Sequence, residues 1–327
     1  MKKILVLAML AVLIFMGFST PAIGGEEGIS VVDARGIEVT LDSPPERIVS
    51  YMPSNTEILF HIGVGDLVVG VDDHSNYPPE VDNLPKVGDL EPDIEHILYL
   101  EPDLVVTAFY NNQLIESMEY HGIPVFATGA TTYDDIFEDM RMLGHICGIS
   151  ETAEQMASQL EDEFHEETKD TRNVPYDERP SVLYITGTWE GINTVGNGTF
   201  IHTLLDNAGF ENIAADKAGW LTYNEEEVVA QDPDVIITTE GMKGVLSDFI
   251  EKDSWQGVTA VELDQVYYVE DDLVSRPGPR AIEGQENLVE LAEGSESGYD
   301  EQEDVPGFAL VLALSALIAA AYVKRRK

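Results

Sequence analysis

Short apolar runs rich in valine and isoleucine alternate along the chain with stretches of helical periodicity. Gly, Asn or Asp follows most of these runs closely, as expected where strands end. Strands are predicted at residues 48–52, 67–71, 104–107, 124–127, 182–186, 235–239 and 266–269. Because alternating strands and helices form parallel sheets covered by helices, the pattern predicts an α/β protein.

Two segments of this pattern match each other. Each begins with a glutamate, Glu95 or Glu226, runs through six residues to Pro-Asp, and ends in an aliphatic strand with a threonine. The glutamate suits the positive end of a short helix, and Pro-Asp ends that helix before the strand. A unit that occurs twice, 131 residues apart, predicts two similar lobes. A common supersecondary unit used twice is the alternative.

Residues 150–171 lie between the two lobes and predict one long helix. Ala153, Met156, Leu160 and Phe164 recur at helical spacing, and no Gly or Pro interrupts them. Ser150 is the expected N-cap. A helix of about 20 residues is about 30 Å long, enough to join two domains rigidly.

The first predicted strand runs directly into Pro53-Ser54-Asn55-Thr56-Glu57 and a short apolar helix that stops at Gly63. Ser54 and Glu57 have the spacing of a capping box, in which each side chain bonds a free backbone amide. The turn is expected at the carboxyl edge of a parallel sheet, where ligands bind in open α/β folds. A well-capped turn without ligand contact is the alternative.

Both ends of the chain differ from its body. Residues 1–24 have two lysines, an uncharged apolar run and then small residues, the order of a secretory signal. Residues 306–327 open with Pro-Gly-Phe, continue without charge to Val323 and end in four basic residues. Their apolar run gives about 24 Å of helix, a little short of a membrane core of about 30 Å. The basic end should stay in the cytoplasm, with the body outside. Residues 293–305 form an acidic linker.

Charge limits the possible functions. The chain has 18 Lys and Arg against 61 Asp and Glu, and six of the basic residues lie in the two ends, which leaves 12 against 61 in the remainder. Such an excess of acids argues against nucleic-acid binding. Cys147 is the sole cysteine, so no intrachain disulfide forms and stability must come from a core. No HExxH, GxSxG or P-loop motif occurs, so no catalytic residue and no enzyme activity is predicted.

In order and spacing, these elements resemble the substrate-binding proteins of ABC importers for cobalamin, ferric siderophores and haem. The resemblance covers about residues 46–292 and rests on residues 47–50, 53–59, 69–71, 77–78, 84–88, 122–125, 208–213 and 277–280, together with the two repeated segments. It implies two Rossmann-like lobes with parallel sheets joined by one long rigid helix, the class III periplasmic-binding-protein fold. The lobes would span residues 25–148 and 173–292, with the helix in residues 149–172.

The resemblance also implies functional residues. Glu95 and Glu226 match the glutamates that meet arginines on a paired permease, and two equivalent exposed carboxylates suit a two-fold symmetric partner. Ordinary surface charge is the alternative for both. The ligand contacts of the family fall on His74, Trp220 and Arg276, with Asp272 nearby, and Tyr110 and Trp189 neighbour other contact positions.

Aromatic walls with a few polar anchors suit a metal chelate. Asp89 and Ala108 stand where some cobalamin binders have aromatic rings, which weakens an assignment to cobalamin alone. For Trp220, core packing is the alternative to a ligand wall. His74 could serve a free-metal receptor, but one histidine is too few to hold a metal selectively.

The Pro-Gly-Phe end resembles the archaeal sorting signal known as PGF-CTERM, which implies that the tail is removed and replaced by a lipid; a retained membrane span is the alternative. Asn197-Gly198-Thr199 is a glycosylation sequon in the turn expected after the strand at Val182, and a plain Asn-Gly turn is favoured. Together these features predict an extracellular receptor, anchored to the membrane, that delivers a corrinoid or ferric siderophore to an ABC permease dimer. No cofactor is expected. A zinc or manganese receptor and a surface envelope or adhesion module are the alternatives.

Overall fold

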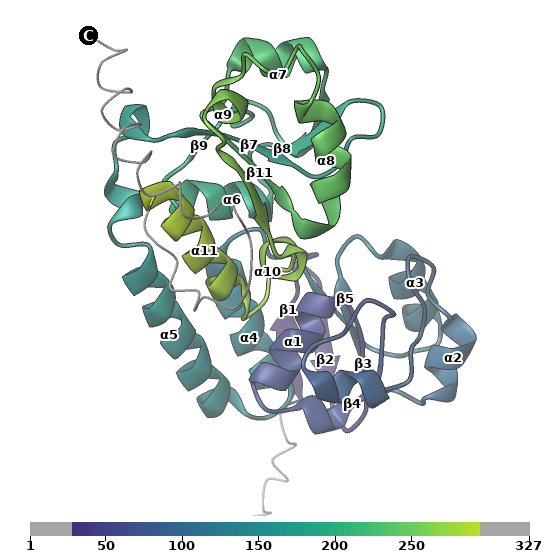
Figure 1. The fold of residues 1–327 in the computed structure, drawn as a ribbon. Coiled ribbons are helices and arrows are strands. Elements are labelled where there is room, and N and C mark those ends of the chain that lie inside the picture. The colour runs from purple at the N-terminus through teal and green to yellow at the C-terminus, as the bar shows by residue number, and fades with distance from the viewer. Residues whose placement is uncertain (1–27, 295–327) are drawn as a thin grey trace, which may run out of the picture.

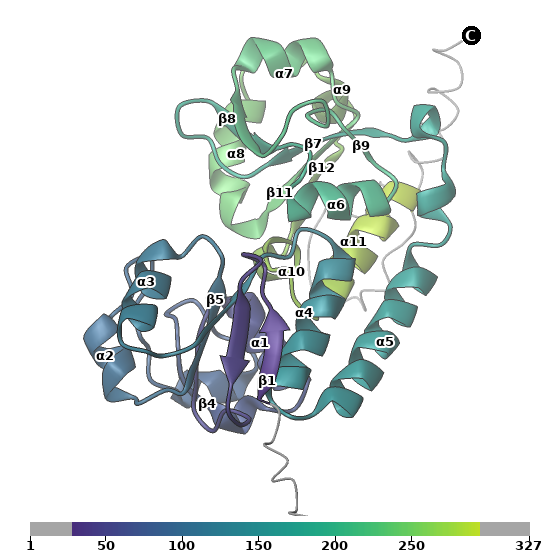
Figure 2. The same ribbon diagram turned by 180° about the vertical axis from the view of Figure 1, so that it is seen from behind.

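The computed structural model describes residues 28–294, which form two lobes (Figures 1 and 2). The predicted secretory signal, the C-terminal anchor and nearly all of the acidic linker lie outside the described residues. Each lobe has a four-stranded sheet in which all strand pairs are parallel. The predicted α/β fold with two parallel sheets is therefore confirmed.

The N-terminal sheet has the order β4-β3-β5-β6, and the C-terminal sheet has the order β9-β7-β11-β12. The strands of the first are β3 (Ile48–Tyr51), β4 (Val68–Val71), β5 (Leu104–Ala108) and β6 (Val125–Thr128). Those of the second are β7 (Ser181–Ile185), β9 (Glu211–Asn212), β11 (Val235–Thr239) and β12 (Val266–Val269). Central strands such as β5 and β11 are buried along their whole length, as expected for sheets covered on both faces.

Helices cover both sheets (Figures 1 and 2). Those of the N-terminal lobe are α1 (Pro53–His61), α2 (Ile94–Tyr99), α3 (Asn112–Tyr120) and α4 (Tyr133–Ile146). Those of the C-terminal lobe are α6 (Phe200–Asn207), α7 (Glu225–Gln231), α8 (Lys243–Ile250), α9 (Thr259–Glu262), α10 (Asp271–Ser275) and α11 (Ala281–Glu293). Among residues 28–294, no helix combines the length and the hydrophobicity needed to cross a membrane.

Two antiparallel pairs were not predicted: β1 (Ile29–Val32) with β2 (Glu38–Leu41), and β8 (Ile192–Val195) with β10 (Trp220–Tyr223). The first pair lies beside the edge strand β6, because the amide of Ala34 donates to the carbonyl of Ala127 at 3.0 Å. All four strands are only four residues long, and β1 and β10 are partly exposed, so their apolar pattern is weak.

The long connecting helix is α5 (Ser150–Glu167), which runs along one side of the molecule beside α4 and α11 (Figures 1 and 2). Ala153, Leu160 and Phe164 are buried, and the ring of Phe164 stacks on that of Tyr133 with 4.1 Å between centroids. The predicted Ser150 cap is wrong. Ile149 occupies the N-cap position, and no side chain caps this helix end.

The two-lobe repeat extends to details that the sequence pattern did not reveal. Glu101 and Asp232 are equivalent positions after α2 and α7, and both have left-handed backbone, with φ of 49° and 47°. Two residues later, the carboxylates of Asp103 and Asp234 each accept a backbone amide at the start of the neighbouring strand, from Arg47 and Ser181 respectively, at 2.9 Å. The same unit is thus built twice.

The predicted capping box of α1 is also wrong. Met52 is the N-cap, no side chain caps the helix, and Pro53 occupies the first turn, where its missing N–H leaves no bond unmade. Glu57 instead points inward and meets arginines from the other lobe. A buried partner outweighed the local cap.

The Asn197-Gly198-Thr199 triplet follows β8, not the strand at Val182 as expected. Gly198 has a φ of 78°, which favours glycine, and the Thr199 hydroxyl caps α6 by accepting the amide of His202 at 3.2 Å. The triplet therefore forms a turn and a helix cap.

Candidate ligand-binding site

The carboxyl edges of the two sheets meet between the lobes. The loop after β4 carries His74 and Asn76, and the segment after β12 carries Asp272 and Arg276. Asn76 Nδ2 donates to Asp272 Oδ2 at 3.1 Å, and Arg276 Nη1 donates to Asn76 Oδ1 at 2.7 Å. Arg276 Nη2 also donates to the His74 carbonyl at 3.3 Å. The fold thus brings together three of the six predicted ligand residues from positions about 200 residues apart in the chain.

Two carboxylates and two guanidinium groups form an inter-lobe ion-pair cluster: Glu57, Asp272, Arg276 and Arg280. The side chain of Glu57 is 2% exposed and accepts from Arg276 Nη1 at 3.1 Å and from Arg280 Nη2 at 2.7 Å. Arg276 Nη2 lies 2.6 Å from Asp272 Oδ1. Paired burial of this kind avoids the desolvation penalty of an isolated charge. The cluster is electrically neutral, with two charges of each sign.

His74 is oriented from two sides. Its amide donates to Asp72 Oδ1 at 2.9 Å, and its ring Nε2 pairs with the Asp89 carboxylate. Burial raises the pKa of Asp72. The Tyr51 hydroxyl donates to the Asp89 carbonyl, and burial together with the charges of Asp72, Asp73 and Asp89 raises the pKa of Tyr51 to about 12. The edge of β3 and β4 therefore has a negative potential.

The three predicted aromatic residues come from three different segments and are all exposed. Tyr110 follows β5 and is 55% exposed, Trp189 lies between β7 and β8 at 66%, and Trp220 begins β10 at 68%. Core packing of Trp220 is thus wrong, whereas Trp255 is fully buried. Within the described residues, no hydrogen bond, ion pair or ring contact joins these three rings to the inter-lobe ion-pair cluster.

Each aromatic residue is positioned locally. The Trp189 ring lies on Gly187, where an added Cβ would come within 1.9 Å of the ring and force the ring to shift. The Tyr110 hydroxyl is 3.7 Å from Met52 Sδ. Partial burial of Tyr110 raises the pKa of its hydroxyl. The Phe109 ring meets that of Tyr110 edge-on at 5.4 Å between centroids.

The sequence analysis missed Phe109, Asn76, Glu57 and Arg280 as parts of this face. Glu57 and Arg280 lie within the motifs that carried the family resemblance, but a pair 223 residues apart leaves no trace in local spacing. Phe109 stands next to the predicted aromatic residue Tyr110, and this adjacency is the signal that could have identified it from the sequence; the structure shows that it is exposed.

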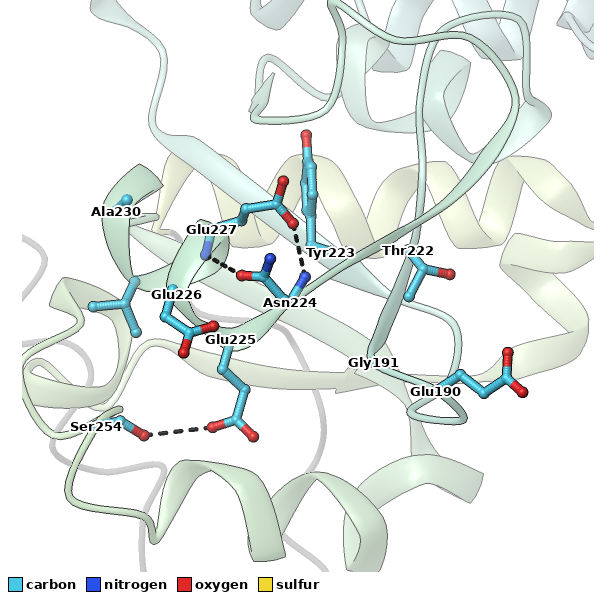
Figure 3. Close-up of a pocket in the computed structure, with 11 residues that line it drawn as sticks. Glu190, Gly191, Thr222, Tyr223, Asn224, Glu225, Glu226, Glu227, Ala230 and Ser254 are labelled. Atoms are coloured by element: carbon cyan, nitrogen blue, oxygen red, sulfur yellow. Dashed lines mark hydrogen bonds between the residues drawn. The ribbon is translucent and has the colours of Figure 1, made fainter.

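Glu95 and Glu226 occupy equivalent positions, each the second residue of its helix, and both are exposed. Figure 3 shows Glu226 beside Glu225 and Glu227 in a surface hollow of about 870 Å³. Glu227 forms a capping box with Asn224, and Glu225 bonds Lys252 and Ser254. Glu226 has no such partner among the described residues, so its carboxylate is available to another protein.

The periplasmic binding protein family matches residues 48–273, and the PGF-CTERM motif matches residues 305–327. The latter confirms the predicted archaeal surface anchor.

Three proteins with similar sequences or structures each match most of this chain. An uncharacterized ABC transporter substrate-binding lipoprotein of Bacillus subtilis, YvrC, is 34% identical over 267 residues, covering 80% of this chain and 84% of that protein. A cobalamin-binding protein of Halobacterium salinarum is 29% identical over 329 residues, covering 90% of this chain and 87% of that protein. The structure of the periplasmic heme-binding protein RhuT from Roseiflexus has a TM-score of 0.68 at 26% identity, covering 76% of this chain and 99% of that one.

Proposed function

Because the chain belongs to the periplasmic binding protein family, we propose that it is the substrate-binding protein of an ABC importer and captures a metal chelate, either a corrinoid or a ferric siderophore. It works at the archaeal cell surface, where the PGF-CTERM anchor holds it. It delivers the chelate to a permease and does no chemistry on it.

One observation carries the proposal: the inter-lobe face joins polar groups of both lobes, at His74, Asp272 and Arg276. The exposed rings of Tyr110 and Trp189 come after β5 and β7, and the exposed ring of Trp220 begins β10. Ligand sites combine aromatic walls with a few polar groups that fix orientation, and flat ligands need both. The relatives named for cobalamin and heme support a metal macrocycle or chelate as the ligand.

Tryptophan fluorescence of the purified protein in high salt tests this function. Trp255 is buried, so a ligand between the lobes should quench chiefly Trp189 and Trp220. We expect saturable quenching by cyanocobalamin, by a ferric hydroxamate or by a ferric catecholate, reduced in Trp189→Phe and Trp220→Phe.

The free-metal alternative predicts a different result. Zinc or manganese would then raise the melting temperature, and none of the chelates would quench. No group of three or more His, Cys, Asp or Glu side chains among residues 28–294 is arranged to hold a metal ion, so nothing there favours this alternative.

Docking to the permease is proposed for Glu95 and Glu226. Exposed interfacial charges act mainly on association and salt dependence, so Glu95→Gln and Glu226→Gln should each weaken permease binding by about fivefold to tenfold. Affinity for the chelate should not change. Glu138→Gln, an exposed glutamate on α4, is the control. Permease affinity that is equal in all three variants would leave the two glutamates as ordinary surface charge.

A further inference from the structure

We infer that the inter-lobe site takes neutral or positively charged chelates and discriminates against anionic ones. The inference rests on the proposed function and names the charge class of its ligand. It follows from the partners of the positively charged side chains and from the carboxylates that form no ion pair, both among the described residues.

The positively charged side chains already contact other groups of the protein. Every Lys and Arg side chain among residues 28–294 contacts a carboxylate, a backbone carbonyl, a histidine or an aromatic ring of the protein. Of the cations that the structure describes, Lys217 and Lys243 contact only an aromatic ring, and an anionic ligand has to compete with a carboxylate, a carbonyl or a histidine for each of the others.

Arg276 and Arg280 both lie at the inter-lobe face, and Arg276 is the predicted ligand contact of the two. Its two terminal nitrogens contact Asp272 at 2.6 Å, Asn76 at 2.7 Å and Glu57 at 3.1 Å. Because the cluster it belongs to is neutral, the attraction of Arg276 and Arg280 for a ligand carboxylate would be offset by the repulsion of Asp272 and Glu57. A neutral ligand with amide groups has no such penalty.

Carboxylates that form no ion pair within the described part of the chain lie at the same sheet edges. Asp73 follows β4, Glu240 follows β11 and Asp271 begins the segment after β12; all three are exposed. Within residues 28–294 the carboxylates of Asp73 and Glu240 make no hydrogen bond or ion pair with another side chain, whereas the carboxylate of Asp271 accepts a hydrogen bond from Ser275 and forms no ion pair. The charges of Asp73 and Asp89 act on Tyr51, and the charge of Asp272 acts on Asp271. Both lobes therefore contribute negative potential to the site.

The size of the effect follows from Coulomb's law. One uncompensated charge about 8 Å from a ligand charge, in a partly solvated site, changes affinity by about threefold to tenfold. Two or three such carboxylates should give a clear preference, and salt should reduce it.

Chelates that differ only in charge test the inference on the full chain. Ferrioxamine B carries one positive charge, its N-acetyl derivative is neutral and its N-succinyl derivative is negative. Cyanocobalamin is neutral, its monocarboxylic acid is negative, and the amide of that acid with ethylenediamine is positive. In whichever series binds, we expect the negative member to bind at least about tenfold more weakly than the neutral one in 0.15 M KCl. The positive member should bind at least as tightly as the neutral one.

Two variants separate a local effect from total charge. Asp272→Asn should free Arg276 and improve binding of the negative member by about tenfold relative to the neutral one. Asp162→Asn makes the same charge change on the exposed side of α5 and should leave the ratio unchanged.

The outcomes are distinct. A negative member that binds as tightly as the neutral one, or an equal effect of Asp162→Asn and Asp272→Asn, overturns the charge inference and leaves the receptor function standing. Failure of every member of both series to bind overturns the proposed function and the inference with it.

Discussion

The Glu57 carboxylate joins the two lobes at the scale of a single side chain. It is buried, and its partners Arg276 and Arg280 both come from the other lobe. Arg280 also lies over the Tyr77 ring, with 4.1 Å to the centroid. Removing Glu57 would leave two partly buried guanidinium groups with one carboxylate, Asp272, between them.

Glu57→Ala should lower the free energy of unfolding by about 3–5 kcal/mol, because breaking one side of a buried ion pair leaves uncompensated charge. Urea unfolding at constant KCl measures this change. Glu80→Ala, at an exposed glutamate, should change the value by less than about 0.5 kcal/mol. A loss below about 1 kcal/mol for Glu57→Ala would show that the cluster is not important for stability.

Asp139 is a second residue whose surroundings make a prediction. It is 5% exposed on α4, and burial, with the charges of Asp135 and Glu138, raises its pKa from 3.8 to about 8. No hydrogen-bond donor among residues 28–294 contacts its carboxyl group.

The folded protein therefore holds Asp139 protonated where the unfolded chain ionises it. Both states are protonated below about pH 4, and the contribution to stability is then lost as pH rises to about 8, at up to about 1.4 kcal/mol per pH unit. Asp139→Asn should match the parent near pH 4 and be more stable at pH 8. Urea unfolding of both proteins at pH 4, 6 and 8 checks this; parallel pH profiles would contradict it.

At the scale of elements, α4 and α5 pack so closely that a residue larger than glycine does not fit at position 144 without a shift of the helices. A Cβ at Gly144 would lie 2.0 Å from the Cβ of Ala153. This contact fixes the long helix against the N-terminal lobe.

Gly144→Ala should therefore destabilise the protein by about 1–3 kcal/mol through overpacking, although alanine is the better helix former. Gly244 in α8 has open space around its Cβ, so Gly244→Ala is the matched control and should gain up to about 1 kcal/mol. Thermal unfolding of the two variants gives the comparison. Stabilisation by both substitutions would mean that the helices separate without strain.

At the scale of the whole molecule, the lobes are joined in several places besides α5. The Tyr133 hydroxyl donates to the Ala281 carbonyl at 2.7 Å, and the Thr203 hydroxyl donates to the Thr131 carbonyl at 2.8 Å. With the inter-lobe ion-pair cluster, these bonds lie on the same interface.

Ligand binding should consequently produce little hinge motion. Small-angle X-ray scattering, with and without a bound chelate, should give nearly the same radius of gyration. A large decrease on adding ligand would contradict a rigid connection, and Glu57→Ala, which loosens the interface, should be the variant most prone to show one.

Sequence alone determined the layers of this protein. Strands such as β11 could be predicted because a sheet covered on both faces needs continuous apolar runs in its central strands. The two-lobe repeat, the long helix and the anchor were readable for the same reason, since each depends on local composition and periodicity. The antiparallel pairs β1–β2 and β8–β10 were not, because short, half-exposed strands carry little apolar signal.

Only the tertiary structure decided what the charged residues do. Glu57 has the spacing of a helix cap, yet the arginines that form salt bridges with it lie more than 200 residues away in the sequence. Arg276 had the type and position of a ligand anchor, and the fold shows that its guanidinium is held by Asp272, Asn76 and Glu57. Local pattern fixes which face of an element is buried, whereas the partner of a buried charge depends on which elements the fold brings into contact.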